Sequence, residues 1–239
     1  MKKSYLCLLL FCNQVSYADV MNLNEYMPTR LEDASPIDEK TSSLQLSSAF
    51  EENGKEDRLI HRPNIRYGAS KQLQLDVMST IYSGVDEDQS GEIDIGGLYQ
   101  FWISTNWVPV LAINPLFTFP TGKGSKGEDF QYKVLLTSTI NGTPDAPITQ
   151  LHLNMNHSYN DQEKPGERLN QFLYAIGFSH RLSPNTALIV DYLCDEEEVA
   201  EIGLHQSLSG GFQAGVGFGA GLNRDSPSWS WVFGIEKEF

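Results

Sequence analysis

The strongest constraint on the fold is a strict alternation of residue types near the end of the chain. From Phe212 to Leu222 every second residue is apolar, and the residues between them are Gln213 and four glycines. After a turn-rich gap the alternation resumes at Trp229 and continues to Phe239, the last residue. A period of two over ten residues, with one apolar face and one small or polar face, is typical of a membrane-spanning β-strand.

Earlier segments of the chain have the same period. We expect eight further strands: Gln72–Ser79, Ile93–Ile103, Trp107–Phe119, Gln131–Ile140, Ile148–Tyr159, Phe172–Leu182, Thr186–Leu193 and Val199–Leu208. The connections between them alternate between long and short, as in outer-membrane barrels. A soluble β-sandwich would also alternate, but it needs no aromatic-rich faces opposite glycine-lined ones. The sequence therefore predicts an all-β protein, a transmembrane antiparallel up-and-down β-barrel of about 10 strands.

The N-terminal part of the chain divides into two regions. Residues 1–18 have two lysines, a short apolar run and a small-residue cleavage site, which together predict a signal peptide. Residues 19–62 are rich in acidic side chains and show no sustained period of two. We expect them to form a periplasmic leader, either disordered or docked in the lumen. The barrel is then expected over residues 63–239, with Cys194 as its only cysteine.

Composition excludes several classes of function. No run of eighteen apolar residues is present in the chain, so spanning helices are not expected. The formal net charge of −14 argues against a nucleic acid partner. We expect the partners of an outer-membrane barrel: outer-membrane lipids, the barrel-assembly machinery and a small-molecule solute.

A set of polar and glycine residues falls on the inferred lumen faces. The candidate lining residues are Asp76, Lys133, His152, Asn154, Asn156, Arg181, Asp191, Gly215, Gly217, Gly219 and Glu236. Charged members of this set could simply pair across a narrow interior, because an unpaired buried charge is costly. They could instead form a polar track for a solute. The glycines would leave room for a plug or a ligand, and if that room is open, Gly217→Leu should block passage.

One acidic stretch resembles a calcium-binding loop. Asp86, Asp88, Ser90 and Asp94 have the spacing of the first ligands of such a loop, with Gly91 at the bend. The twelfth position, which should be a bidentate glutamate, is Gly97. The flanking residues also favour strands over helices. An ordinary acidic outer loop is the competing interpretation, and no other cofactor is expected.

Short motifs in a fixed order resemble a known family. They are Arg62-Pro63, Gln72-Leu73-Gln74-Leu75-Asp76, the run Pro115 to Gly122, Leu151-His152-Leu153-Asn154, Leu182-Ser183-Pro184 and the run Gly215 to Pro227. Together the motifs resemble the outer-membrane family named after the MetA pathway of phenol degradation, described as transporters. The resemblance implies a barrel for the passage of hydrophobic or aromatic small molecules.

These features predict a narrow transporter or channel in the bacterial outer membrane. The strong negative charge disfavours anionic solutes, so we expect small neutral or hydrophobic molecules, aromatic ones included. The alternative is a structural or surface-interaction barrel with a closed lumen. A surface hydrolase would need acidic and histidine residues at the rim, and only His157 and Asp161 fit that place. No Gly-x-Ser-x-Gly motif is present, so we do not expect an enzyme.

Overall fold

The computed structural model describes residues 20–52, 57–83, 91–102, 108–121, 129–160, 170–194, 197–224 and 226–239. The predicted signal peptide, residues 1–18, lies outside these ranges. Within the described ranges, no helix has both the length and the apolar character required to cross a bilayer.

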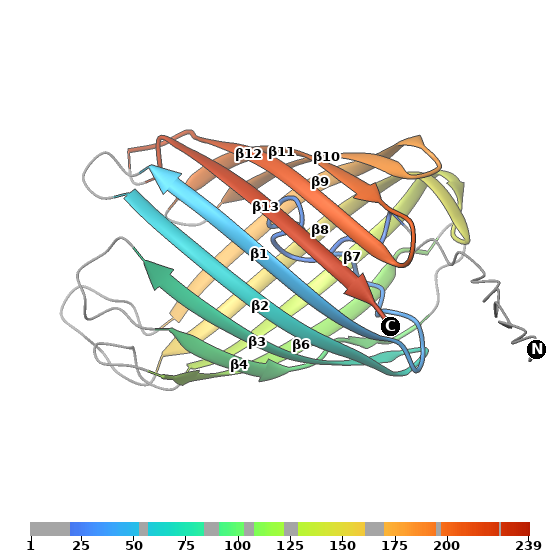
Figure 1. Ribbon diagram of the computed structural model, residues 1–239, viewed down its shortest axis with the longest axis horizontal. Helices are drawn as coiled ribbons and strands as arrows, with labels where there is room; N and C mark the ends of the chain where they lie inside the picture. Colours follow the sequence, from blue (N-terminus) through green and yellow to red (C-terminus); the bar gives the residue numbers. More distant parts are fainter. Residues whose placement is uncertain are drawn as a thin grey trace, which may run out of the picture.

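The described residues form thirteen strands in one antiparallel sheet that closes on itself (Figure 1). The strands are β1 Ser42–Glu52, β2 Asp57–Ser70, β3 Leu73–Ser83, β4 Glu92–Gly96, β5 Tyr99–Gln100, β6 Val110–Pro120, β7 Asp129–Thr143, β8 Ala146–Asn160, β9 Asn170–Ser183, β10 Thr186–Cys194, β11 Glu198–Ser207, β12 Phe212–Gly221 and β13 Trp229–Glu238. Closure occurs where β1 pairs with both β2 and β13.

The barrel has twelve strand positions. β4 and β5 both pair with β3 and with β6, so they occupy one position as an interrupted strand. The prediction of about 10 strands was therefore wrong. The two additional strands are β1 and β2, most of whose residues lie in the range predicted to be a leader.

The sequence of β1 and β2 explains why they were missed. In β1 the residues Ser43, Gln45 and Ser47 are buried in the lumen, but Ser48 interrupts the apolar series on the outer face. In β2 the run His61 to Asn64 is polar on both faces and includes Pro63. Such a strand has a weak period of two, and only its neighbours in the barrel stabilise it.

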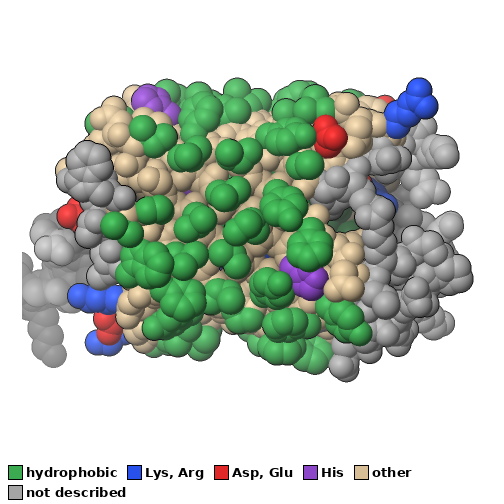
Figure 2. Space-filling view, turned by 180° about the vertical axis from the view of Figure 1, so that it is seen from behind, with side chains coloured by type: hydrophobic (Ala, Val, Ile, Leu, Met, Phe, Trp, Pro, Cys, Tyr) green, Lys and Arg blue, Asp and Glu red, His purple; other side chains and the backbone are tan. Residues whose placement is uncertain are grey.

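The outer surface of the barrel is apolar. Side chains that alternate with buried ones along β12 and β13 are exposed: Phe212, Val216, Phe218, Trp231, Phe233 and Ile235. Hydrophobic side chains cover the wall in Figure 2, and the charged side chains visible there lie near the two ends. Such a band suits the hydrocarbon core of a bilayer, which confirms the predicted place of the chain in the outer membrane.

Substitution on this face should destabilise the barrel. Phe233 lies in the middle of β13 and is 57% exposed, so Phe233→Arg would place a charge in the hydrocarbon. We expect a loss of about 2–4 kcal/mol in the free energy of unfolding, measured by urea denaturation in lipid vesicles. Leu208→Arg, beside the turn between β11 and β12, should cost about 1 kcal/mol or less. Equal losses for the two variants would contradict this membrane placement.

The two ends of the barrel are distinguished by their connections. Short turns join β2 to β3, β7 to β8, β9 to β10 and β11 to β12, and they lie at the end where β1 begins and β13 finishes. In outer-membrane barrels, short turns face the periplasm. We call this end the inner end and the opposite one the outer end.

Candidate functional site

Residues 20–37, named here the internal segment, lie inside the barrel. They precede β1 and form a loop within the ring of strands (Figure 1). The loop doubles back on itself, since the amide of Asp33 donates to the carbonyl of Leu23 at 2.9 Å. The lumen is therefore occupied by the chain's own residues.

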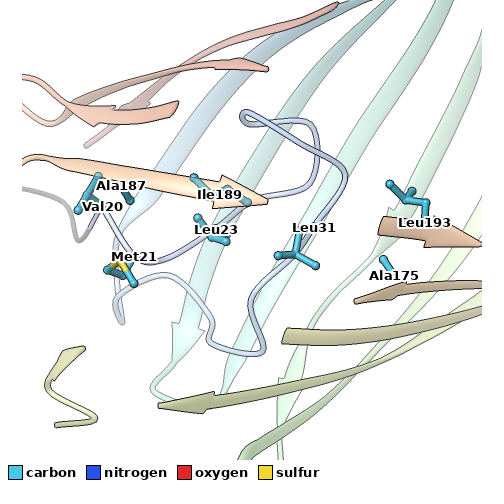
Figure 3. Packing of buried hydrophobic residues seen from close by; sticks show 8 residues of the cluster. All are labelled: Val20, Met21, Leu23, Leu31, Ala175, Ala187, Ile189 and Leu193. Atoms are coloured by element: carbon cyan, nitrogen blue, oxygen red, sulfur yellow. The ribbon is translucent and has the colours of Figure 1, made fainter. Parts of the chain in front are cut away.

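Apolar contacts hold the internal segment at two places. Val20, Met21, Leu23 and Leu31 pack against side chains of β9 and β10, as shown in Figure 3. The wall residues of this cluster are Ala175, Ala187, Ile189 and Leu193. Further along, Ala34 belongs to a second cluster with Leu98, Val110, Ala112 and Leu135. The small wall residues leave space for the segment's larger side chains.

Ion pairs connect the internal segment to the wall. The Lys133 ammonium contacts the carboxylates of Glu25 and Glu32, the latter at 3.1 Å. Arg30 lies 3.3 Å from Glu201 and 3.6 Å from Glu51. Burial acts to lower the pKa of the Arg30 guanidinium, but the carboxylates, Glu201 first, raise it above its ordinary value. Arg30 is therefore charged at every relevant pH.

A second polar contact lies nearer the inner end. The guanidinium of Arg66 pairs with Glu236, and these side chains are only 3% and 0% exposed. Asn24 of the internal segment joins both, because it accepts from Arg66 and donates to Glu236, the latter at 2.8 Å. Arg66 and Glu236 belong to strands far apart in sequence, so the barrel must close before this contact can form.

The glycines of the lumen face make room for the internal segment. A Cβ atom on Gly217 would lie 2.1 Å from the carbonyl oxygen of Pro28. On Gly215 it would come within 3.1 Å of Met27 and Pro28, and on Gly203 within 2.5 Å of the Pro28 ring. Close packing of wall and segment therefore requires glycine at these positions.

A cavity of about 220 Å³ lies in the lumen on the outer side of the internal segment. We call it the outer cavity. Glu25, Tyr26, Arg30 and Glu32 of the segment form part of its lining. The wall contributes charged, amide and apolar side chains: Arg62, Met78, Thr80, Tyr82, Glu92, Asp94, Leu116, Gln131, Lys133, Asn154, Asn156, Leu173, Ala175 and Leu193. A smaller space of about 30 Å³, near Arg66 and Asp76, shares Lys133 with it. The two spaces also share Glu25, Glu32, Met78, Asp94 and Leu116, so they adjoin each other.

The structure brings only some of the predicted lining residues together. Lys133, Asn154 and Asn156 line the outer cavity, whereas Asp76 lines the smaller space. His152 is fully buried between Thr137 and Ser179, which lie 3.1 and 2.9 Å from its ring nitrogens.

The remaining predicted residues lie elsewhere on the wall. Asp191 is buried opposite Glu201 in the register of β10 and β11. A Cβ on Gly219 would meet Ser230 and not the internal segment. Arg181 is partly exposed near the inner end of β9. A solute role for any residue of the predicted set stays a prediction.

Sequence reasoning missed the residues that the internal segment contributes. Glu25, Tyr26, Arg30 and Glu32 lie in a stretch without periodicity, and their partners are roughly 20 to 170 residues away. Arg62 and Arg66 were missed because β2 was not recognised as a strand. Together with Asn64 and Gly68 they form an inner face with a period of two, opposite the exposed Ile65 and Tyr67, and this was the signal that could have identified them.

The calcium hypothesis receives no structural test at three of its four residues. Asp86, Asp88 and Ser90 lie outside the described residues. Asp94 points into the lumen, where it accepts a hydrogen bond from the Thr118 hydroxyl at 2.5 Å. Among the residues that the structure describes, no group of three or more acidic, histidine or cysteine side chains could hold a metal ion.

His157, considered above for a hydrolase, has aromatic neighbours. Its ring lies 4.4 Å from that of Phe172 and 5.1 Å from that of Tyr132. Its Nε2 atom is 3.1 Å from the Asn170 side-chain oxygen. Asp161 lies outside the described residues. His157 therefore belongs to an aromatic row on the barrel wall.

Similarity to known proteins is structural only. No protein-family model matches the sequence, and no curated protein does either. The fold matches the COG4313 outer membrane channel from Pseudomonas putida F1 with a TM-score of 0.64 and 10% identity, covering 87% of this chain and 98% of that one. It matches the KdgM porin in complex with disordered oligogalacturonate with a TM-score of 0.62 and 9% identity, covering 82% and 99%. It matches the NanC porin with a TM-score of 0.59 and 10% identity, covering 80% of this chain and 98% of that one.

These matches show the fold of small outer-membrane channels. The three neighbours are described as channels or porins, not as enzymes. Membership of the family named after the MetA pathway stays a prediction.

Proposed function

We propose that this barrel is a narrow outer-membrane channel for small solutes, closed by its internal segment and opened when that segment moves. The observation that carries the proposal is the cavity of about 220 Å³ at the outer end, whose lining includes Glu25, Tyr26, Arg30 and Glu32 of the segment. A solute that enters from outside would therefore meet the segment before it could pass.

The twelve-stranded size supports a channel. Eight strands leave an interior just filled by side chains, whereas sixteen or more leave an aqueous pore. A twelve-stranded barrel lies between these limits, and here the added space holds a chain segment. Displacement of that segment would leave a passage lined by polar residues of the wall.

The solutes we propose are small and neutral, with aromatic molecules included. The cavity mixes apolar side chains such as Met78 and Leu173 with polar ones. A cavity of about 150 Å³ is large enough to hold benzene, so a single six-membered ring fits the present one. Larger solutes would require the segment to leave.

A closed structural barrel is the second candidate, and the number of anchors favours it. Two apolar clusters and the pairs at Lys133, Arg30 and Arg66 all hold the internal segment. If these anchors never release, the lumen does not conduct and the barrel serves as a surface platform.

Removal of residues 20–37 separates the two candidates. We expect wild-type protein in lipid vesicles to admit a neutral single-ring solute slowly, and the deletion variant to admit it at least tenfold faster. Vesicle swelling measures the rate, and a shift in gel mobility on heating shows that the variant has folded. If a folded deletion variant and the wild type are equally impermeable, the channel proposal fails and the structural barrel remains.

A further inference from the structure

The outer cavity contains an arginine without an ionic partner. Arg62 of β2 lies over the ring of Tyr26, with its guanidinium carbon 3.6 Å from the ring centre. Among the described residues no carboxylate forms an ion pair with it, whereas Arg30 and Lys133, which line the same cavity, are both paired. The five N–H donors of Arg62 are therefore held in place by the tyrosine and remain free to bind a solute.

Two amides on β8 face the same space. Asn154 and Asn156 both line the cavity, and neither side-chain oxygen has a hydrogen-bond partner among the described residues. Asn154 is only 6% exposed. A buried amide without a partner is costly, and each amide carries donors and an acceptor. A molecule in the cavity that both donates and accepts would satisfy them.

The charges around the cavity disfavour an anion at Arg62. Four carboxylates line it, those of Glu25, Glu32, Glu92 and Asp94, against three cationic side chains. Two more, Glu51 and Glu201, pair with Arg30 from the wall. A bound carboxylate would gain one arginine and be repelled by several acids. A hydroxyl group has no such cost, and it donates and accepts at once.

We propose that the outer cavity is a binding site for a small neutral molecule that carries adjacent hydroxyl groups on a six-membered ring. Arg62 donates to one hydroxyl oxygen, the amides of Asn154 and Asn156 bind the others, and the ring carbons lie against Tyr82 and Leu173. This inference rests on the proposed function, because it names the class of solute that would reach the internal segment.

Calorimetric titration of the full-length protein in detergent micelles tests the site. The probes are myo-inositol, a saturated ring, and catechol, an aromatic one, with benzoate as the anion. We expect at least one hydroxylated ring to bind, and Arg62→Met and Asn154→Leu each to weaken its binding about tenfold. Arg224→Met, an exposed arginine outside the cavity lining, should bind like the wild type.

Several results would overturn the inference. It fails if neither hydroxylated ring binds, if benzoate binds more tightly than both, or if the two cavity variants bind like Arg224→Met. Heat-shifted gel mobility checks that each variant is folded, and Asn156→Leu provides a second amide variant should Asn154→Leu not fold. Vesicle permeability is measured separately. If a hydroxylated ring binds but no variant is permeable, the channel proposal fails and the binding site stands. If the barrel is permeable but no ring binds, the binding site fails and the channel proposal stands.

Discussion

Replacement of Lys133 by methionine should release the internal segment and open the lumen. Lys133 is the only cation that contacts Glu25 and Glu32 among the described ion pairs, and its side chain is 10% exposed. Removal of one partner from a buried ion pair costs about 3 kcal/mol, because the carboxylates lose their counter-charge. A cost of this size raises the population of the released segment about 150-fold.

Bilayer conductance and limited proteolysis of residues 20–37 measure this release. Lys40→Met is the matched control, because the Lys40 side chain is 81% exposed and its ammonium forms an ion pair with Glu39 at 3.7 Å. Such a surface pair contributes little to stability, so this variant should stay closed and resistant to protease. If Lys133→Met is as closed and as resistant as Lys40→Met, the ion pairs do not hold the segment.

The second large effect is expected for Gly217→Leu. From the sequence alone, a leucine here would fill open lumen and block passage. The structure reverses this expectation, because a Cβ at Gly217 would lie 2.1 Å from the carbonyl oxygen of Pro28. The segment backbone would have to move, at a cost of about 1–3 kcal/mol. Conductance should therefore rise, and protease should cleave the segment faster.

Ala214→Leu provides the matched control for this variant. Ala214 lies in the same strand, on the outer face that alternates with the buried glycines. A leucine there adds apolar surface toward lipid and leaves the lumen unchanged. A Gly217→Leu variant that folds and conducts less than wild type would show that the space beside Gly217 is open in the membrane, and that the packing against Pro28 is not maintained.

The glycines of β12 show how much a local sequence pattern can predict. The alternation in β12 predicted a strand with glycines toward the lumen, because a period of two depends only on neighbours in the chain. What those glycines pack against could not be predicted in the same way. Met27 and Pro28 lie almost two hundred residues earlier, in a stretch without any period.

The sequence by itself determined which face of each strong strand contacts lipid, the antiparallel barrel and the outer-membrane location. These properties follow from side-chain alternation and from the apolar solvent around the wall. Tertiary structure alone decided the strand number and the content of the lumen. β2 carries Arg62 and Arg66 on its inner face, where Arg62 lies over the Tyr26 ring and Arg66 contacts Asn24 and Glu236. Contacts between residues so distant in sequence form only when the barrel closes around its internal segment.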